Sequence, residues 1–315
     1  MNKQWIHTGM FLIAIALLVW AELYLRPSGV DHMLFRFPRL LTTVFVGISL
    51  SISGLIIQTV FRNPLAGPYI TGVIPGAYFA VAVFLLLVPF LGSHAVLTAI
   101  GLKAFAMVGG LSIMLLQLVL LRKYKSVTIM LLFGVVLGYF LSGGSQVLVS
   151  VSSAKNIQSF VQWGFGSFDK VFGSELWILG GITAFTIMGY IRLIGPLQVY
   201  IVGDDLAANT GVNLRSLRFW SVALAGATAG LITAYCGPIS FVGMVAPQFI
   251  RLISPSQALN TLSLNTMLAG IVFCLMADVA SHYLIENMQL SVNAMAAILG
   301  APIVAISLFA NRKLF

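Results

Sequence analysis

Two arginines three residues apart, Arg36 and Arg39, flank a proline at the start of a long apolar run. Residues at this spacing project from similar sides of one helical turn. Because guanidinium groups bind carboxylates in a bidentate manner, the pair could form a cationic pad for an acidic partner outside the membrane. The alternative is that both stems extend along lipid until the charged heads reach water. Positive residues are disfavoured on the outer side of a membrane, which favours the docking interpretation.

A second polar segment, residues 203 to 218, reads GDDLAANTGVNLRSLR and separates two apolar runs. Asp204 or Asp205 can cap a short helix here, and Gly211 can end it. Such a helix could lie on the membrane surface or fit a groove on a partner protein. The two acids and the scarcity of large apolar residues favour the protein groove.

Asp278 is an acid deep within a late apolar run. Acids inside the membrane are costly and indicate a functional site by default. A proton relay needs several such groups, and the sequence indicates only this one. We therefore expect Asp278 to have a structural pairing or helix-end role near a subunit contact.

Residues 141 to 146, LSGGSQ, resemble the signature motif of ATP-binding-cassette (ABC) ATPases. ATP binding also requires a phosphate loop of the form G-x-x-x-x-G-K-[ST], and the sequence contains no Gly-Lys pair. We therefore expect that the chain is not an enzyme and that it binds no cofactor. Cys236 and Cys274 lie in apolar surroundings, where a thiol behaves as a small hydrophobe, so no disulfide or metal site is predicted.

The elements that position these residues are predicted to be membrane helices. Hydrophobic residues make up 59% of the 315-residue chain and charged residues 8%, against about 25% charged in soluble domains. About ten apolar runs are present, most of them long enough to span a bilayer, and the eighth is short and broken. The predicted fold class is an all-α polytopic membrane protein, with residues 1–315 forming a single transmembrane domain. The runs are 8–25, 40–60, 71–91, 95–120, 128–150, 176–194, 219–236, 239–253, 261–285 and 292–310.

The formal charge of +9 reflects the excess of Lys and Arg that membrane proteins keep on the cytoplasmic side, not a nucleic-acid interface. Ten spans with both termini in the cytoplasm place most of the 17 basic residues inside. This distribution supports the multi-pass topology, and the family resemblance described below implies the bacterial cytoplasmic membrane. The inner set is Lys3, Arg62, Arg122, Lys123, Lys125, Arg192, Arg215, Arg218, Arg251, Arg312 and Lys313, and the outer set is Arg26, Arg36, Arg39, Lys103, Lys155 and Lys170.

Proline and glycine interrupt two apolar stretches, residues 62–77 and 236–251. Irregular backbone at membrane depth is tolerated only where it is buried in protein or lines a watery cavity. We therefore expect both segments to lie against a translocation pathway or at its ends. Glycine pairs inside the predicted helices, such as Gly47 with Gly54, are expected to let helices pack closely.

The fifth apolar run carries several small or weakly polar residues: Gly138, Ser142, Ser145 and Gln146. They could form a smooth pathway wall that does not grip a substrate. Helix packing is an equally good explanation, because small residues also mark helix interfaces.

Several motifs in order resemble the permease family of bacterial ABC importers for iron–siderophores, haem and vitamin B12. The R-x-P-R pattern at Arg36 precedes a small-residue helix and an R-N-P-L-A-x-P turn at Arg62. Residues 163–167, WGFGS, are similar to the family's outer W-x-x-G-S segment, and residues 237–247, GPISFVGMVAP, are similar to its G-x-I-x-F-x-G-L-x-x-P segment. The late A-D at 277–278 and G-A-P at 300–302 are also similar, so the likeness covers nearly the whole chain.

The resemblance implies a type II importer permease of ten helices, paired with an identical or related second permease subunit. It implies two cytoplasmic ATPase subunits that carry ATP and magnesium, and an extracytoplasmic substrate-binding protein. It further implies site roles for four groups of residues. These are docking of the binding protein at Arg36, Arg39 and His282; ATPase coupling at Asp204, Asp205, Leu206, Ala207, Gly211 and Arg215; a gate and path at Ser126, Thr128, Gly138, Ser142, Ser145 and Gln146; and a structural turn at Asn63, Pro64 and Pro68.

Two positions depart from the family pattern. His282 stands where the family has a third docking arginine, so that contact would be absent or dependent on pH. Gln248 stands where the family usually has histidine, and we expect a structural hydrogen bond there rather than a metal or proton role.

The leading functional hypothesis is import of an iron chelate, a ferric siderophore. Haem or cobalamin import by the same kind of transporter is the first alternative. An ion-coupled secondary transporter is the second, and the scarcity of intramembrane acids argues against it.

Overall fold

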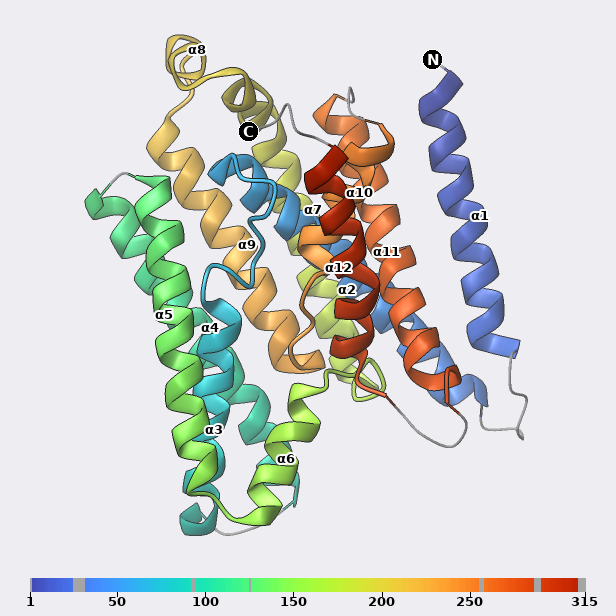
Figure 1. Cartoon of the computed structure of the whole chain (residues 1–315), viewed down its shortest axis with the longest axis vertical. Coiled ribbons are helices and arrows are strands. Elements are labelled where there is room, and N and C mark those ends of the chain that lie inside the picture. Colours follow the sequence, from blue (N-terminus) through green and yellow to red (C-terminus); the bar gives the residue numbers. More distant parts are fainter. Residues whose placement is uncertain are drawn as a thin grey trace.

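The computed structural model describes residues 2–24, 32–91, 95–124, 126–254, 258–285 and 290–310, and these residues form helices without any strand (Figure 1). Of the basic residues assigned to a membrane side above, Arg26, Lys125, Arg312 and Lys313 lie outside this part of the chain. The helices are α1 (Asn2–Tyr24), α2 (His32–Phe61), α3 (Val73–Leu91), α4 (Ala95–Tyr124), α5 (Val127–Ser150), α6 (Ala154–Gly164), α7 (Ser174–Val202), α8 (Asp204–Asn209), α9 (Leu214–Cys236), α10 (Val242–Ile253), α11 (Leu259–Tyr283) and α12 (Val292–Ala310).

Each predicted apolar run coincides with one helix, and α6 and α8 are additional short helices in the connections. Within the described residues, seven helices are long and apolar enough to cross a membrane, and α3, α10 and α12 are shorter apolar helices. The eighth run, expected to be short, is the 12-residue α10. The sequence analysis missed α6 because it is too short to span a bilayer, although Ser153 caps it by accepting a hydrogen bond from the Asn156 amide.

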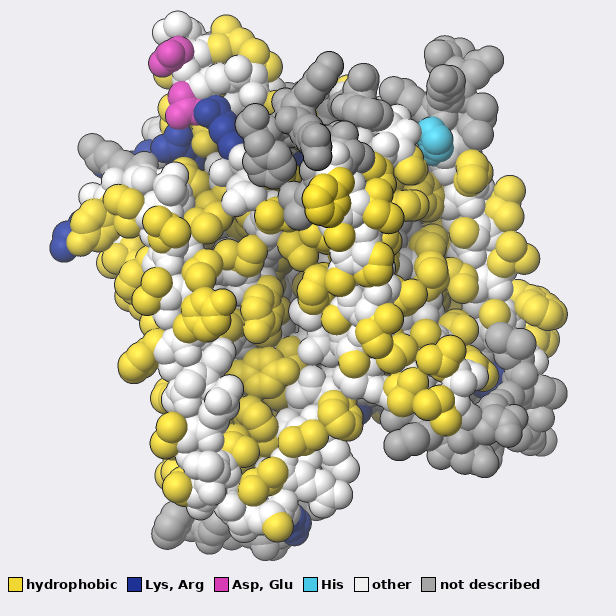
Figure 2. All heavy atoms as spheres, in the orientation of Figure 1, with side chains coloured by type: hydrophobic (Ala, Val, Ile, Leu, Met, Phe, Trp, Pro, Cys, Tyr) yellow, Lys and Arg dark blue, Asp and Glu magenta, His cyan; other side chains and the backbone are white. Residues whose placement is uncertain are grey.

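The surface is that of a membrane protein. Hydrophobic side chains cover most of the face seen in Figure 2, and acidic and basic side chains gather around α8. Large apolar side chains are strongly exposed, among them Trp177 (85%), Tyr139 (78%) and Phe309 (75%). Exposure on this scale is stable only against lipid or another apolar surface.

Helix α2 lies at the centre of the bundle and contacts α7, α9, α10 and α11. Its glycines allow this, because a Cβ at Gly54 would overlap the carbonyl of Gly243 on α10, and one at Gly47 would lie 2.8 Å from the carbonyl oxygen of Gly270 on α11. The interpretation of these glycines as close-packing residues is confirmed. In lipid, such close approach replaces the hydrophobic force that holds soluble helices together.

The chain leaves α2 through a sharp reversal. Arg62 has a φ of 47°, and the Asn63 amide donates to the Gln58 carbonyl at 3.2 Å, which closes the end of the helix. Residues 62–72 then run back from the end that carries α8 toward the middle of the molecule, where α3 begins at Val73 (Figure 1). Asn63, Pro64 and Pro68 therefore form the turn that the sequence indicated, and the turn continues inward.

Replacing Gly54 by alanine is expected to destabilise the protein by about 1–3 kcal/mol or more, because the added methyl group meets rigid backbone of α10. The melting temperature in detergent measures the effect. Gly181→Ala on α7 is the control, since a Cβ there meets no atom within 4 Å. An equal melting temperature for both variants would show that the α2–α10 contact adjusts without cost.

Candidate functional site

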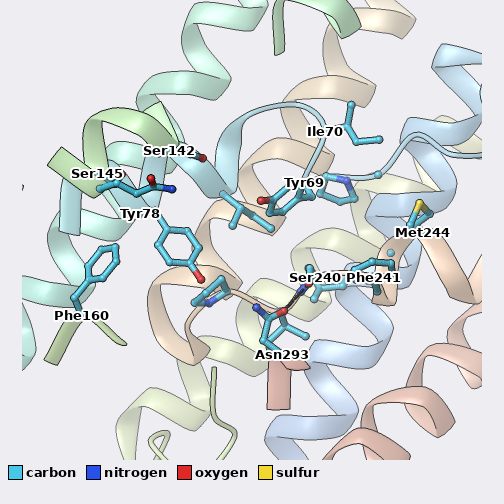
Figure 3. Close-up of a pocket in the computed structure, with 18 residues that line it drawn as sticks. Tyr69, Ile70, Tyr78, Ser142, Ser145, Phe160, Ser240, Phe241, Met244 and Asn293 are labelled. Carbon is cyan, nitrogen blue, oxygen red and sulfur yellow. Dashed lines mark hydrogen bonds between the residues drawn. The ribbon is translucent and has the colours of Figure 1, made fainter. Parts of the chain in front are cut away.

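The two irregular segments meet at one pocket of about 470 Å³, shown in Figure 3. The segment after α2 contributes Gly67 to Ile70, and the segment before α10 contributes Pro238 to Phe241. These residues of both breaks therefore line a cavity, and its identity with the expected translocation pathway stays a prediction. None of the residues that line the pocket carries a charge, so it presents apolar groups with a few hydroxyl and amide groups.

Helix α5 forms the facing wall of this pocket. Ser142, Ser145 and Gln146 line it, and the Ser145 hydroxyl is satisfied by the Leu141 carbonyl at 2.7 Å. Gly138 does not line it; it packs on Pro75 of α3, where a Cβ would lie 3.4 Å from the proline ring. The packing interpretation therefore holds for Gly138, whereas Ser142, Ser145 and Gln146 line the pocket and their role in a pathway stays a prediction.

The predicted gate lies at the other end of α5. Ser126 caps the helix by accepting a hydrogen bond from the Ile129 amide at 3.3 Å, and Thr128 is exposed. Ser126 also lines a second pocket of about 220 Å³ between α4 and α5, together with Met130 and Phe133.

Tight backbone contacts join residues 163–167 to the segment that begins at Gly237, beside the pocket. Gly166 and Gly237 both have positive φ, and a Cβ at Gly237 would lie 2.6 Å from the Trp163 carbonyl oxygen. The two motifs that contain these glycines are therefore in direct contact. Asn293, at the start of α12, joins the two motifs. Its side chain accepts hydrogen bonds from the Ser240 amide at 3.0 Å and from the Ser240 hydroxyl, and its backbone amide donates to the Phe165 carbonyl at 3.0 Å.

Gln248 makes the structural hydrogen bond that was expected of it. Its side-chain amide donates to the Pro64 carbonyl at 2.6 Å and so holds the inward-running segment against α10. Nearby, Gln58 donates to the Met244 carbonyl at 3.0 Å and accepts from Arg251. The two glutamine side chains thus satisfy partly buried backbone carbonyls of Pro64 and Met244.

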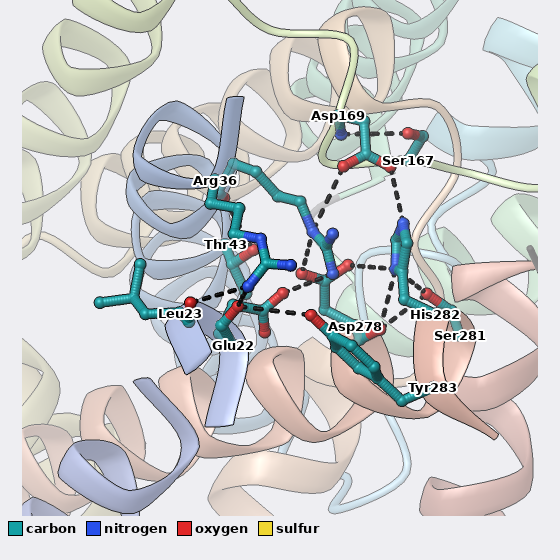
Figure 4. A network of polar contacts seen from close by, with 11 residues as sticks. Glu22, Leu23, Arg36, Thr43, Ser167, Asp169, Asp278, Ser281, His282 and Tyr283 are labelled. Carbon is teal, nitrogen blue, oxygen red and sulfur yellow. Dashed lines mark hydrogen bonds and ion pairs between the residues drawn. The ribbon is translucent and has the colours of Figure 1, made fainter. Parts of the chain in front are cut away.

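At the opposite end from α8, Arg39 lies at the centre of a buried ion network (Figure 4). Its Nε lies 2.7 Å from the Asp278 carboxylate and 3.2 Å from that of Asp169, and its guanidinium also pairs with Glu22. The side chains of Arg39, Glu22 and Asp278 are 9%, 1% and 0% exposed. The pairing predicted for Asp278 is confirmed, and its partner is Arg39.

His282 completes the network, with Nε2 3.0 Å from the Asp169 carboxylate and Nδ1 3.0 Å from the Asp278 carbonyl oxygen. The network thus joins α1, α2, α11 and the loop before α7. Glu22 and Asp169 were missed by the sequence analysis, which counted Asp278 as the only intramembrane acid. Glu22 lies inside the first apolar run, and its position there was the signal that could have identified it.

The three residues predicted to dock the binding protein, Arg36, Arg39 and His282, therefore lie close together, but they do not form an exposed cationic pad. The charge of Arg39 is buried among three carboxylates and is not presented at the surface, so its docking role stays a prediction. His282 also points inward, to Asp169 and Asp278 (Figure 4). Arg36 is half-buried and donates to the Glu22 and Leu23 carbonyls at 3.1 and 2.7 Å, so it fastens the end of α1.

The predicted coupling segment forms α8. Gly203, not Asp204 or Asp205, occupies the N-cap, so the capping prediction was wrong. Asp204 instead pairs with Arg62 and Arg218. Gly211 follows the helix with a φ of 86°, as a residue that ends a helix does. Asp205, Leu206 and Arg215 are exposed, whereas Ala207 is buried.

Across the described part of the chain, no group of three or more His, Cys, Asp or Glu is arranged to hold a metal ion. Cys236 and Cys274 are buried free thiols, as the sequence indicated.

Comparison with known proteins decides the family. Residues 9–310 match the FecCD transport family. The chain belongs to the FecCD transport family. The vitamin B12 import system permease proteins BtuC of Salmonella arizonae and Klebsiella pneumoniae are both 30% identical to it, over 96% of this chain and 86% of theirs.

The fold agrees with this assignment. A solved structure described as an inward-facing conformation of a putative metal-chelate type ABC transporter superposes on this FecCD permease with a TM-score of 0.84, at 23% identity over 98% of this chain and 99% of the other. PsaBC from Streptococcus pneumoniae in complex with a Fab superposes less closely, with a TM-score of 0.53 at 18% identity over 89% of this chain and 93% of the other.

This FecCD permease is thus an integral membrane subunit of an ABC importer and not an enzyme, with ATP hydrolysis on partner subunits. The predictions of the family, of the all-α membrane fold and of the missing ATPase function are confirmed. The alternative hypothesis of an ion-coupled secondary transporter is wrong.

Arg39→Gln is expected to destabilise this FecCD permease by about 3–5 kcal/mol, because it leaves buried carboxylates without their cation. The melting temperature in detergent measures the loss. Lys170→Gln, at an exposed lysine next to the network, is the control. A stable Arg39→Gln protein that fails only to bind a partner would restore Arg39 as a docking residue.

Proposed function

We propose that this chain forms the translocation pathway of an importer for a bulky metal chelate, with a ferric siderophore as the substrate. The observation that carries the proposal is the uncharged pocket between Ser142 on α5 and the two irregular segments. A wall of small hydroxyl, amide and apolar groups suits a large chelate that must pass without being held. Selectivity would then reside in the binding protein that delivers the substrate.

Cobalamin is the second candidate. The curated relatives reported above are named as vitamin B12 permeases, and they share 30% identity with this chain. Haem has no comparable support from these relatives.

We propose that α8 faces the cytoplasm and meets an ATPase subunit through its exposed residues Asp205 and Leu206, with Arg215 beside it. ATP and magnesium are bound on that partner. In Figure 1 the start of α1 and the end of α12 lie at the end of the molecule that carries α8, which supports a cytoplasmic position for both. A second permease copy, identical or related, would complete the pathway.

The opposite end would receive the substrate-binding protein. Because Arg39 is buried, the proposed cationic contact at this end is Arg36, which lies closer to the surface at the start of α2. His282 would act on this surface only indirectly, through its contact with Asp169.

The substrate is tested with the complete complex, reconstituted with its ATPase and binding protein. Binding protein loaded with ferric siderophore, haem or cobalamin is added separately, and ATP hydrolysis is measured. The largest stimulation is expected with the ferric siderophore. Stimulation by cobalamin alone would replace the first candidate by the second, and no stimulation by any metal chelate would contradict the substrate class.

Ser142→Trp tests the pathway. The indole would fill part of the pocket, and uptake of substrate into proteoliposomes is expected to fall about tenfold or more, because each ~1.4 kcal/mol added to a barrier lowers a rate about tenfold. Met188→Trp, at an exposed position on α7 outside the pocket, is the control. Equal uptake by both variants would place the pathway elsewhere.

A further inference from the structure

The Arg62 side chain connects α8 to the segment that reaches the pocket. Its Nη2 donates to the Asp204 carboxylate at 2.5 Å and to the Tyr200 carbonyl at 2.9 Å. Asp204 is the first residue of α8, and Arg62 is the first residue after α2. One side chain therefore bridges the start of α8 and the start of residues 62–72.

A second arginine binds the same carboxylate. Nη2 of Arg218, on α9, lies 2.6 Å from the other oxygen of Asp204. Both guanidinium groups lie over the Tyr200 ring, at 4.6 Å for Arg62 and 5.5 Å for Arg218. The cluster thus fixes the orientation of Asp204 from two sides, with only one of the two arginines on the pocket segment.

The backbone at Arg62 does not by itself favour arginine. A φ of 47° belongs to the left-handed region, where a helix commonly ends in glycine. The ion pair is also exposed, with 47% of the Arg62 side chain and 39% of the Asp204 side chain accessible, and exposed pairs contribute little to folding stability. The turn therefore does not account for an arginine here, and the exposed ion pair with Asp204 adds little to folding stability.

The chain after Arg62 is held firmly down to the pocket. The Leu65 amide donates to the Asn63 side chain at 2.9 Å, and Gln248 donates to the Pro64 carbonyl. Ala66 is 1% exposed, and the next residue, Gly67, lines the pocket. A displacement of Arg62 would therefore move the pocket wall rather than be absorbed by a loose loop.

We infer that Arg62 is a positioning residue that transmits movement of α8 to the pocket wall. When the ATPase shifts α8, Asp204 carries Arg62 and residues 62–72 with it, and the wall formed by Gly67 to Ile70 moves. Arg218 anchors the same carboxylate but does not belong to the wall segment. This inference rests on the proposed contact between α8 and the ATPase.

Arg62→Gly removes the side chain but preserves the turn, because glycine adopts the left-handed conformation without strain. In the reconstituted complex, assembly with the ATPase and the melting temperature should stay as in the unmodified protein. The amount of substrate transported per ATP hydrolysed should fall about tenfold, within the range reported for residues that carry coupling. Arg218→Gln is the matched control and should keep this ratio within about twofold.

A second readout needs no substrate. A fluorophore attached at Tyr69→Cys, an exposed position at the pocket, reports movement of the wall when ATP binds, and the native thiols are buried. We expect the signal to be lost in Arg62→Gly and kept in Arg218→Gln. If both variants keep the signal, or both lose it, the inference is overturned. A normal signal together with no stimulation by any loaded binding protein would instead contradict the proposed substrate class.

Discussion

Backbone that leaves the helix inside a membrane must find its hydrogen bonds within the protein, and this constraint shapes the centre of the molecule. Residues 62–72 and 237–241 are such backbone. Three glutamines supply donors to carbonyls in this region: Gln58 to Met244, Gln117 to Thr71 and Gln248 to Pro64. The helices around them approach closely because glycines remove side chains at the crossings. The pocket exists because this irregular backbone is held in place.

The two ends of the bundle use charge in opposite ways. At one end, Arg39 is surrounded by Glu22, Asp169 and Asp278 in a buried network that ties four parts of the chain together. Such a network makes the end rigid, because removing Arg39 leaves the buried carboxylates of Glu22 and Asp278 without their cation. At the other end, Asp204 binds the exposed Arg62 and the more buried Arg218. The exposed Arg62–Asp204 pair contributes little to stability and can therefore be used to transmit movement.

This contrast relates structure to the work of an importer permease. In the function proposed here, one end keeps its shape while a partner delivers substrate, and the other end moves with the ATPase. Between them lies an uncharged pocket with walls of small and apolar residues. A bulky chelate can pass such a surface without a strong binding site that would have to be emptied at every cycle.

The sequence by itself determined the membrane class, the ten apolar helices, the two breaks and the family. These follow from composition, apolar length and the order of short motifs, which are properties of neighbouring residues. It also indicated the close-packing glycines and the hydrogen bond of Gln248. Only the tertiary structure decided where the charges lie. Arg39 has the same spacing from Arg36 whether it faces solvent or carboxylates, and Glu22 and Asp169 are 147 positions apart in the printed sequence. Their convergence on Arg39 depends on how α1, α2, α11 and the loop before α7 pack, and local pattern carries no information about that packing.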